Sequence, residues 1–156
     1  MLYAILTAAL IALDQAVKYL VRAHIPLYSS RPFIPHVLQL THVRNTGAAF
    51  SVFSDHTWLL TLISAVVSVA LAALLLKGVV AHPAGRVCLS VVLAGAVGNL
   101  IDRVLFGYVT DMFDLLFLSF AIFNVADICV VCGGAATCIY LLFFYERLEV
   151  LPGGEG

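Results

Sequence analysis

Charged residues are what this sequence has least of. They make up 11% of its 156 residues, against 63% hydrophobic residues, and the mean hydropathy is +1.08. The net charge of −1 provides no basic surface for a nucleic acid, so we expect no nucleic-acid partner. A composition this apolar lies outside the range of soluble globular domains, and the length suits one domain. We therefore predict a single membrane domain over residues 1–156.

Common catalytic and metal-binding motifs are also missing. The sequence contains neither the H-E-x-x-H motif of zinc peptidases nor a G-x-S-x-G nucleophile turn. The five histidines are scattered singly through polar segments. We interpret them as solvated loop histidines. The alternative is a metal site at His36 and His42. We accordingly expect no metal and no other cofactor.

The four cysteines do not indicate a disulfide framework. All of them lie in apolar runs, where a free cysteine behaves as a small hydrophobic residue. Cys129 and Cys132 have C-x-x-C spacing, but no second cysteine pair and no βαβ pattern supports a zinc site or thioredoxin chemistry. We predict that these thiols pack as apolar side chains.

Long apolar runs dominate what is present. A bilayer crossing takes about 20 residues, and the sequence has four suitable runs, at residues 2–21, 57–76, 87–106 and 124–145. The first carries Asp14 and lacks the basic start of a secretory signal, so we predict a retained transmembrane helix. Residues 24–56 contain three prolines and the alternating run VLQLTHVRN, which predicts a small β-rich lobe with one or two strands. Residues 107–123 are expected to form a short connection.

The predicted fold class is therefore an all-α membrane protein, with four transmembrane helices and a β-rich lobe between the first two. Four crossings place both termini on one side, and the lobe and the 107–123 connection on the other. The polar residues of the helices then gather at the face that carries the lobe. The positive-inside rule does not orient this arrangement. Once Lys18 and Arg103 are set aside as site candidates, each face has three Lys or Arg residues.

Four aspartates fall within the largely apolar stretch of residues 95–127, namely Asp102, Asp111, Asp114 and Asp127. A carboxylate among apolar side chains carries a large desolvation penalty, so it must be paired or used. Asp111 and Asp127 have no neutralising neighbour in sequence, and the predicted hairpin brings them towards each other. Two such carboxylates share a proton, which is the aspartic-protease arrangement. The spacing alone leaves Asp111 and Asp114 as alternatives.

The remaining polar residues of the helices admit two interpretations. Asp14 and Lys18 are one helical turn apart in the favourable order for an ion pair. Asn99 and Arg103 share one helix face with Asp102 close by, and Asn124 precedes Asp127 by one turn. These groups form either a buried network that locks helix packing or part of a functional site.

A proton-coupled transporter is the alternative function, with Asp14, Asp102 and Asp127 as a relay. Transporters tend to place ionisable groups near the membrane midplane and to show repeated halves. In this sequence the charges cluster at one predicted face, and the first two helices share no pattern with the last two. Both observations favour the peptidase.

Five motifs, in this order, resemble those of the bacterial lipoprotein signal peptidases (signal peptidase II), a family of aspartyl intramembrane peptidases. They are Asp14-Gln15 with Lys18, residues 44–51 (RNTGAAFS), 95–103 (GAVGNLIDR), 107–113 (GYVTDMF) and 123–127 (FNVAD). The match to the family covers nearly the whole chain. The sequence departs from the family pattern at Ile128, where Ser is usual, and at Met112, where Phe is usual.

The resemblance implies that Asp111 and Asp127 are the catalytic pair, in place of Asp114. The other implied binding or supporting residues are Asp14, Lys18, Asn45, Gly47, Asn99, Asp102, Arg103 and Asn124. It also implies cytoplasmic termini, a site near the outer face of the inner membrane, and a lobe that rests on the membrane as a β-cradle. The implied substrates are prolipoproteins cut before a diacylglyceryl cysteine, with membrane lipid around the site and globomycin-type antibiotics as inhibitors.

Overall fold

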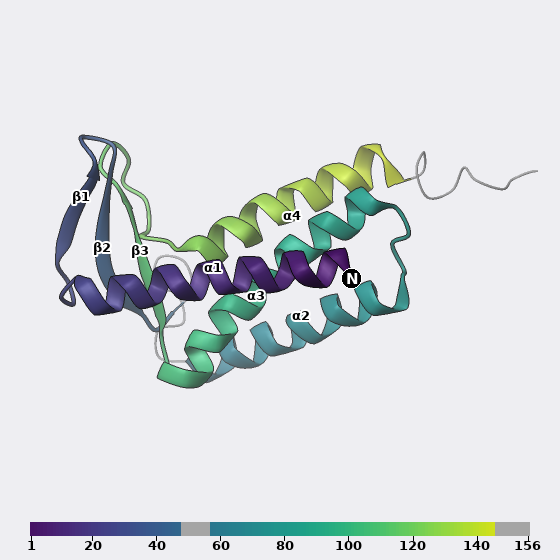
Figure 1. The fold of residues 1–156 in the computed structure, drawn as a ribbon, viewed down its shortest axis with the longest axis horizontal. Coiled ribbons are helices and arrows are strands. Elements are labelled where there is room, and N and C mark those ends of the chain that lie inside the picture. The colour runs from purple at the N-terminus through teal and green to yellow at the C-terminus, as the bar shows by residue number, and fades with distance from the viewer. Residues whose placement is uncertain (48–56, 146–156) are drawn as a thin grey trace, which may run out of the picture.

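The computed structural model describes residues 1–47 and 57–145. The elements are α1 (Leu2–His24), β1 (Ser30–Ile34), β2 (Leu38–Asn45), α2 (Thr57–Lys77), α3 (Pro83–Phe106), β3 (Val109–Leu115) and α4 (Val125–Phe143). The four helices run along the long axis of the molecule, and the three strands lie across one end of them (Figure 1). Motif residues 48–51 lie outside the described part of the chain.

All four helices are long enough and apolar enough to cross a membrane, as the sequence predicts. Their ends differ from the predicted ones: α1 continues from residue 21 to His24, and α3 begins at Pro83 instead of residue 87. Pro83 occupies the first turn of the helix, where its missing N–H costs no hydrogen bond. The ring of His82 caps this end by accepting from Ala84 N at 3.2 Å.

Helix α3 contacts each of the other three helices. Two glycines allow this close approach. A Cβ atom on Gly95 would clash with the carbonyl oxygen of Ala126 in α4, and one on Gly98 would lie 2.7 Å from a carboxylate oxygen of Asp14 in α1. Neither site has room for a side chain, so these two glycines set the spacing between the helices that surround the polar centre.

The sheet is antiparallel in the order β1-β2-β3. Strands β1 and β2 come from the predicted lobe, but β3 comes from residues 107–123, which we expected to be a connection only. Its pairing with β2 brings Val43 opposite Asp111, and a further bridge joins Phe113 to Phe123. The third strand therefore carries one of the candidate catalytic aspartates into the sheet.

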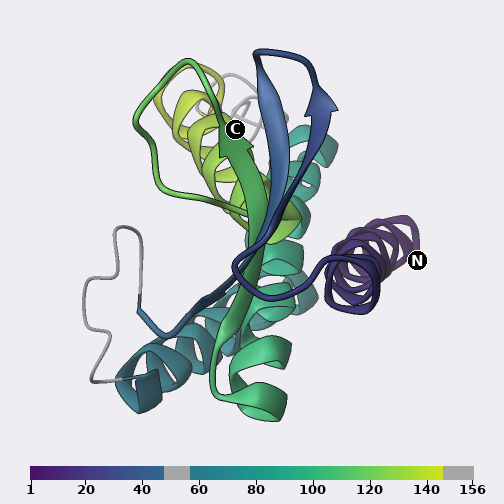
Figure 2. The same cartoon turned by 90° about the vertical axis from the view of Figure 1, so that its left-hand side faces the viewer.

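A small apolar cluster attaches the sheet to α1, which lies beside the strands (Figure 2). Val21 and Ile25, at the end of α1, pack with Met112 of β3, which is fully buried. Leu40 and Phe113 pack around this cluster. Met112 is one of the departures from the family pattern, and its flexible side chain fills this junction.

Candidate active site

Asp111 on β3 and Asp127 in the first turn of α4 are brought together at the sheet end of the helices and line the same cavity. Each of their four carboxylate oxygens accepts one amide N–H. Asp111 accepts from Asn124 Nδ2 at 2.6 Å and from Asn45 Nδ2 at 2.9 Å. Asp127 accepts from Asn99 Nδ2 at 2.8 Å and from the backbone N of Asn124 at 3.1 Å. Four hydrogen bonds from neutral donors therefore hold the pair.

The position of Asp127 follows from the way α4 begins. Asn124 is the N-cap residue, and its Oδ1 accepts from Asp127 N at 2.9 Å, while the Asp127 carboxylate accepts from Asn124 N. This reciprocal capping box satisfies two backbone donors that would otherwise lack partners. The FNVAD motif thus starts the helix and aims Asp127 at the cavity with the same residues.

Burial, and to a smaller extent repulsion from Asp127, raise the pKa of Asp111 from 3.8 to about 6. Hydrogen bonds from Asn45 and Asn124, and the charge of Lys18, act against this rise. A carboxyl group with this pKa keeps its proton well above the range of an ordinary aspartate. The electrostatics therefore fit a pair that shares one proton.

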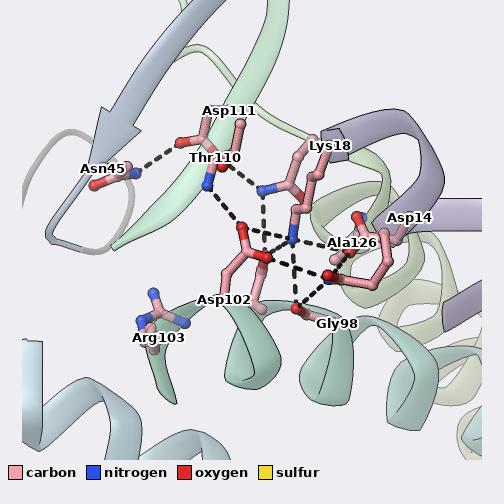
Figure 3. Close-up of polar contacts among 12 residues, drawn as sticks. Asp14, Lys18, Asn45, Gly98, Asp102, Arg103, Thr110, Asp111 and Ala126 are labelled. Carbon is pink, nitrogen blue, oxygen red and sulfur yellow. Dashed lines mark hydrogen bonds and ion pairs between the residues drawn. The ribbon is translucent and has the colours of Figure 1, made fainter. Parts of the chain in front are cut away.

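Lys18 lies behind the pair and is fully buried. Its Nζ is 2.9 Å from Asp14 Oδ2 and 3.7 Å from Asp102 Oδ2, and it donates to Asn99 Oδ1 at 2.9 Å (Figure 3). The ion pair between Asp14 and Lys18 that the spacing suggested is present. Because Lys18 fixes Asn99 Oδ1, the amide nitrogen of Asn99 is turned towards Asp127.

The two acids beside Lys18 each hold one backbone amide from a segment that forms the site. Asp14 Oδ1 accepts from Ala126 N at 2.8 Å, and Asp102 Oδ2 accepts from Thr110 N at 2.9 Å. Each of these amides belongs to the residue immediately before one of the paired aspartates. The cluster of Asp14, Lys18 and Asp102, which we call the buried triad, therefore connects α1 and α3 to both of those segments.

Arg103 approaches the cavity from α3. Its guanidinium donates to the carbonyl oxygen of Gly47 at 3.3 Å and to Ser64 Oγ at 3.5 Å. Gly47 N donates in turn to Asn45 Oδ1 at 2.9 Å, which orients the amide that reaches Asp111. Among the described residues, no group of three or more His, Cys, Asp or Glu side chains could hold a metal ion.

The cavity in front of the pair has a volume of about 410 Å³ and mostly apolar walls. They include Val109, residues 120–123 and residues 128 and 130–132 of α4. Val131 and Ile128 are also exposed on the outer surface of the helix. The cavity therefore reaches from the polar pair to the apolar face of α4.

The structure separates the predicted site residues into two groups. The cavity is lined by Asn45, Gly47, Asn99, Arg103, Asp111 and Asp127. Asn124 and the buried triad lie behind it. Asp114 lies elsewhere, because it accepts from Gln39 at 2.7 Å and from Thr41 at 3.0 Å within the sheet.

Sequence reasoning did not include Arg22 among the site residues. Its Nη1 is 3.7 Å from Asp102 Oδ2 and donates to Thr110 Oγ1 at 2.9 Å. The available signal was its position one helical turn after Lys18. Gln15 was seen in the first motif only, and its amide donates to Asp14, to Gly98 O and to Asp102.

The family described as signal peptidase (SPase) II has a sequence model that matches residues 6–143 of this chain. The chain belongs to the signal peptidase II family. A lipoprotein signal peptidase of Enterococcus faecalis is 45% identical over 154 residues, which cover 99% of this chain and 94% of the relative. One from Brevibacillus brevis is 41% identical over 133 residues, covering 85% and 89% of the two chains.

Two solved structures of bacterial membrane enzymes are similar to this fold. One superimposes with a TM-score of 0.84 at 29% identity, covering 99% of this chain and 93% of the other. The second has a TM-score of 0.82 at 33% identity, with 91% and 93% covered. These matches confirm the family resemblance and the predicted fold class. Signal peptidase II membership and four apolar helices make the protein a multi-pass bacterial membrane peptidase, and leave the transporter hypothesis without support.

Proposed function

We propose that this signal peptidase II is an aspartyl endopeptidase that cleaves prolipoproteins before a diacylglyceryl cysteine. Asp111 and Asp127 form its catalytic pair. The observation that carries this proposal is the pairing of two buried carboxyl groups, each held by amide donors, at the polar end of one apolar cavity. Such a cavity suits a substrate whose cleaved bond lies beside lipid.

The proposed reaction is a hydrolysis by the shared-proton mechanism. The ionised carboxylate takes a proton from water as the water oxygen bonds to the scissile carbonyl carbon. The protonated carboxyl group gives its proton to the carbonyl oxygen. The C–N bond of the resulting diol then breaks. The amine of the cysteine leaves with the proton that the first carboxylate had taken, and a hydroxyl of the diol returns a proton to the second carboxylate as the new carboxyl group forms.

The apolar walls of the cavity place the substrate. In this proposal the diacylglyceryl chains stay in the bilayer beside α4, and the lipidated cysteine holds the peptide bond against the catalytic pair. Orientation of this kind lowers the activation free energy by several kcal/mol, on the order of what intramolecular reactions gain. Globomycin-type inhibitors would occupy the same cavity. The termini are cytoplasmic and the site lies near the outer face of the membrane.

The buried triad acts as a positioning device in this mechanism. Asp14 and Asp102 fix the backbone just before the two catalytic residues, and Lys18 fixes both acids and Asn99. None of the three lines the cavity. They set the separation and orientation of the catalytic pair without touching the substrate.

A gel-shift assay of the purified protein in detergent tests the proposal. The substrates are a prolipoprotein with a diacylglyceryl cysteine and the same protein without the lipid. We expect the wild type to cut only the lipidated form, and Asp111→Asn and Asp127→Asn to reduce the rate by at least roughly a thousandfold, since each removes half of the acid–base pair. Asp114→Asn is the matched control and should stay active.

Thermal melting shows whether each of these variants is folded. Substantial cleavage by a folded Asp127→Asn variant would contradict the aspartyl mechanism. A folded wild type that cuts neither substrate would contradict the whole proposal.

A further inference from the structure

The last turn of α1 packs against the face of β3 from which Asp111 points away. Successive side chains of a strand point to opposite faces, so Thr110 and Met112 share one face and Asp111 has the other. Thr110 and Met112 are both fully buried. Met112 packs with Val21 of α1, and Thr110 Oγ1 accepts from Arg22 Nη1 at 2.9 Å. Adjacent residues of α1 therefore hold the two neighbours of Asp111.

Thr110 is held through its backbone and through its side chain at the same time. Its backbone N–H donates to Asp102 Oδ2 at 2.9 Å, and its hydroxyl oxygen accepts from Arg22. Arg22 Nη1 is also 3.7 Å from the same carboxylate oxygen of Asp102, so the three residues form a closed ring of contacts. Rotation of residue 110 would break one side of this ring. The ring therefore fixes the backbone immediately before Asp111.

The guanidinium of Arg22 is itself held in place by the end of α3. Its central carbon lies 4.7 Å from the centre of the Phe106 ring, and a cation is attracted to an aromatic face. Phe106 is the last residue of α3, and Gly107 follows it in the left-handed conformation that turns the chain towards β3. The Phe106 ring also stacks on Tyr108, with 5.8 Å between the ring centres. Arg22 thus contacts the chain on both sides of this turn.

The contact with Thr110 distinguishes Arg22 from an ordinary surface ion pair. The Arg22 side chain is 21% exposed and its distance to Asp102 is 3.7 Å, and a partly exposed pair at this separation contributes little stability. The hydrogen bond to Thr110 is shorter and ends on a fully buried hydroxyl. Loss of a charged donor to a buried group is the more costly of the two changes. The hydroxyl is therefore where we expect Arg22 to have its effect.

We propose that Arg22 is a positioning residue that acts on Asp111 through the hydroxyl of Thr110. The inference rests on the proposed role of Asp111 in cleavage, and Arg22 itself does not line the cavity that holds the catalytic pair. Two asparagines hold the Asp111 carboxylate, while Arg22 and Asp102 hold the backbone just before it. Misplacement of a reacting group by about 1 Å costs a rate up to about 100-fold. The rate of cleavage therefore depends on this contact.

A double-mutant cycle on the cleavage rate tests the inference. The variants are Arg22→Met, Thr110→Val and the two combined, and kcat and KM are measured with the lipidated prolipoprotein and purified protein in detergent. We expect each single variant to lower kcat by roughly tenfold, as for one hydrogen bond from a charged donor, with little change in KM. The double variant should lose no more than either single variant, because both substitutions remove the same contact.

Two further variants serve as controls, and thermal melting shows whether each protein is folded. Thr110→Ser keeps the hydroxyl that accepts from Arg22, so it should recover most of the kcat that Thr110→Val loses. Arg31→Met is the matched control for the arginine, because Arg31 is exposed on β1 and does not line the cavity. That variant should keep the kcat of the wild type.

The outcomes separate this inference from the proposed function. An unchanged kcat in folded Arg22→Met and Thr110→Val variants shows that the contact only supports the fold, and overturns the inference. Losses that multiply in the double variant also overturn it, because Arg22 then acts by a route other than the hydroxyl. If Arg22→Met does not fold, Thr110→Val and Thr110→Ser decide without any change of charge, and an equal kcat in these two overturns the inference. A wild type that cuts no substrate overturns the proposed function itself.

Discussion

Three asparagines hold the candidate catalytic pair by hydrogen bonds. Asn45, Asn99 and Asn124 each donate a side-chain amide to one of the two carboxyl groups. Amides do not titrate in the physiological range, so they orient carboxylates without competing for the shared proton. Asn124 also donates to Asn99 Oδ1 at 3.2 Å, which links the two halves of the pair. The geometry of the acids is therefore set by neighbours whose charge is constant with pH.

Ionisation of Asp111 should make stability depend on pH. Burial and Asp127 raise its pKa from 3.8 to about 6, so between these values the folded protein holds a proton that the unfolded chain releases. This contribution to stability is present below about pH 4 and is lost as the pH rises through about 6. Asp111→Asn removes the ionisation. Its free energy of unfolding should therefore rise relative to that of the wild type as the pH rises, by up to about 3 kcal/mol.

Thermal melts of both proteins in detergent between about pH 4 and pH 8 measure this difference. Asp114→Asn serves as the control, because its carboxylate lies in the sheet away from the pair. A difference between Asp111→Asn and the wild type that stays constant over the whole range would show that burial does not perturb this carboxyl group.

At the scale of helices and strands, the buried triad is the joint between α1, α3 and the two segments that carry the pair. Lys18→Met should destabilise the protein strongly, by about 3–5 kcal/mol, because Asp14 and Asp102 lose their shared cation while still buried. Combining Lys18→Met with Asp14→Asn removes one charge of each sign. An asparagine at position 14 still offers an oxygen to Ala126 N, and Asp102 keeps Arg22 at 3.7 Å. Most of the stability should return.

The cleavage rate of this double variant shows whether Lys18 positions Asn99 in addition to stabilising the fold. Asn99 has lost the Lys18 donor that fixes its amide, so we expect kcat/KM to stay at least roughly tenfold below the wild type, the value of one charged hydrogen bond. Thermal melts and single-turnover cleavage rates measure the two effects separately. Full recovery of cleavage together with stability would mean that Lys18 only supports the fold.

The elements differ in how far the sequence could predict them. The four helices have local signals, because each is a run of apolar residues of membrane-spanning length. Strand β3 lacked such a signal, since VTDMFDL is short, its apolar and polar residues do not alternate, and its partner β2 lies far away in sequence. The start of α3 at Pro83 was missed because proline also marks turns.

The missing sequence signal for β3 also explains why spacing could not distinguish Asp111 from Asp114. Successive side chains of a strand point to opposite faces, so residues three apart lie on opposite faces. Once β3 is a strand, only one of these two aspartates can face the cavity, and the structure places Asp111 there. Spacing had no means to choose while the segment counted as a connection.

At the scale of the whole molecule, the sheet lies across one end of the four helices (Figure 1), and its strand β3 carries Asp111 and Thr110 of the polar centre. Cleavage by the proposed catalytic pair would therefore take place near one membrane surface, whichever way the chain is inserted. The count of Lys and Arg residues does not orient it, because three are predicted on each side once Lys18 and Arg103 are set aside as site residues. The proposed orientation has the site at the outer face, the side on which the mature part of an exported substrate lies.

Single-cysteine labelling tests this orientation in intact cells. The four native cysteines are replaced with alanine, and Arg31→Cys on β1 or Lys77→Cys at the end of α2 is added; both positions are exposed. We expect a membrane-impermeant maleimide to label residue 31 from outside, and to label residue 77 only after the membrane is made permeable. Cleavage activity of each variant confirms that it is folded. Labelling of residue 77 alone in intact cells would invert the proposed orientation and place the catalytic pair at the cytoplasmic face.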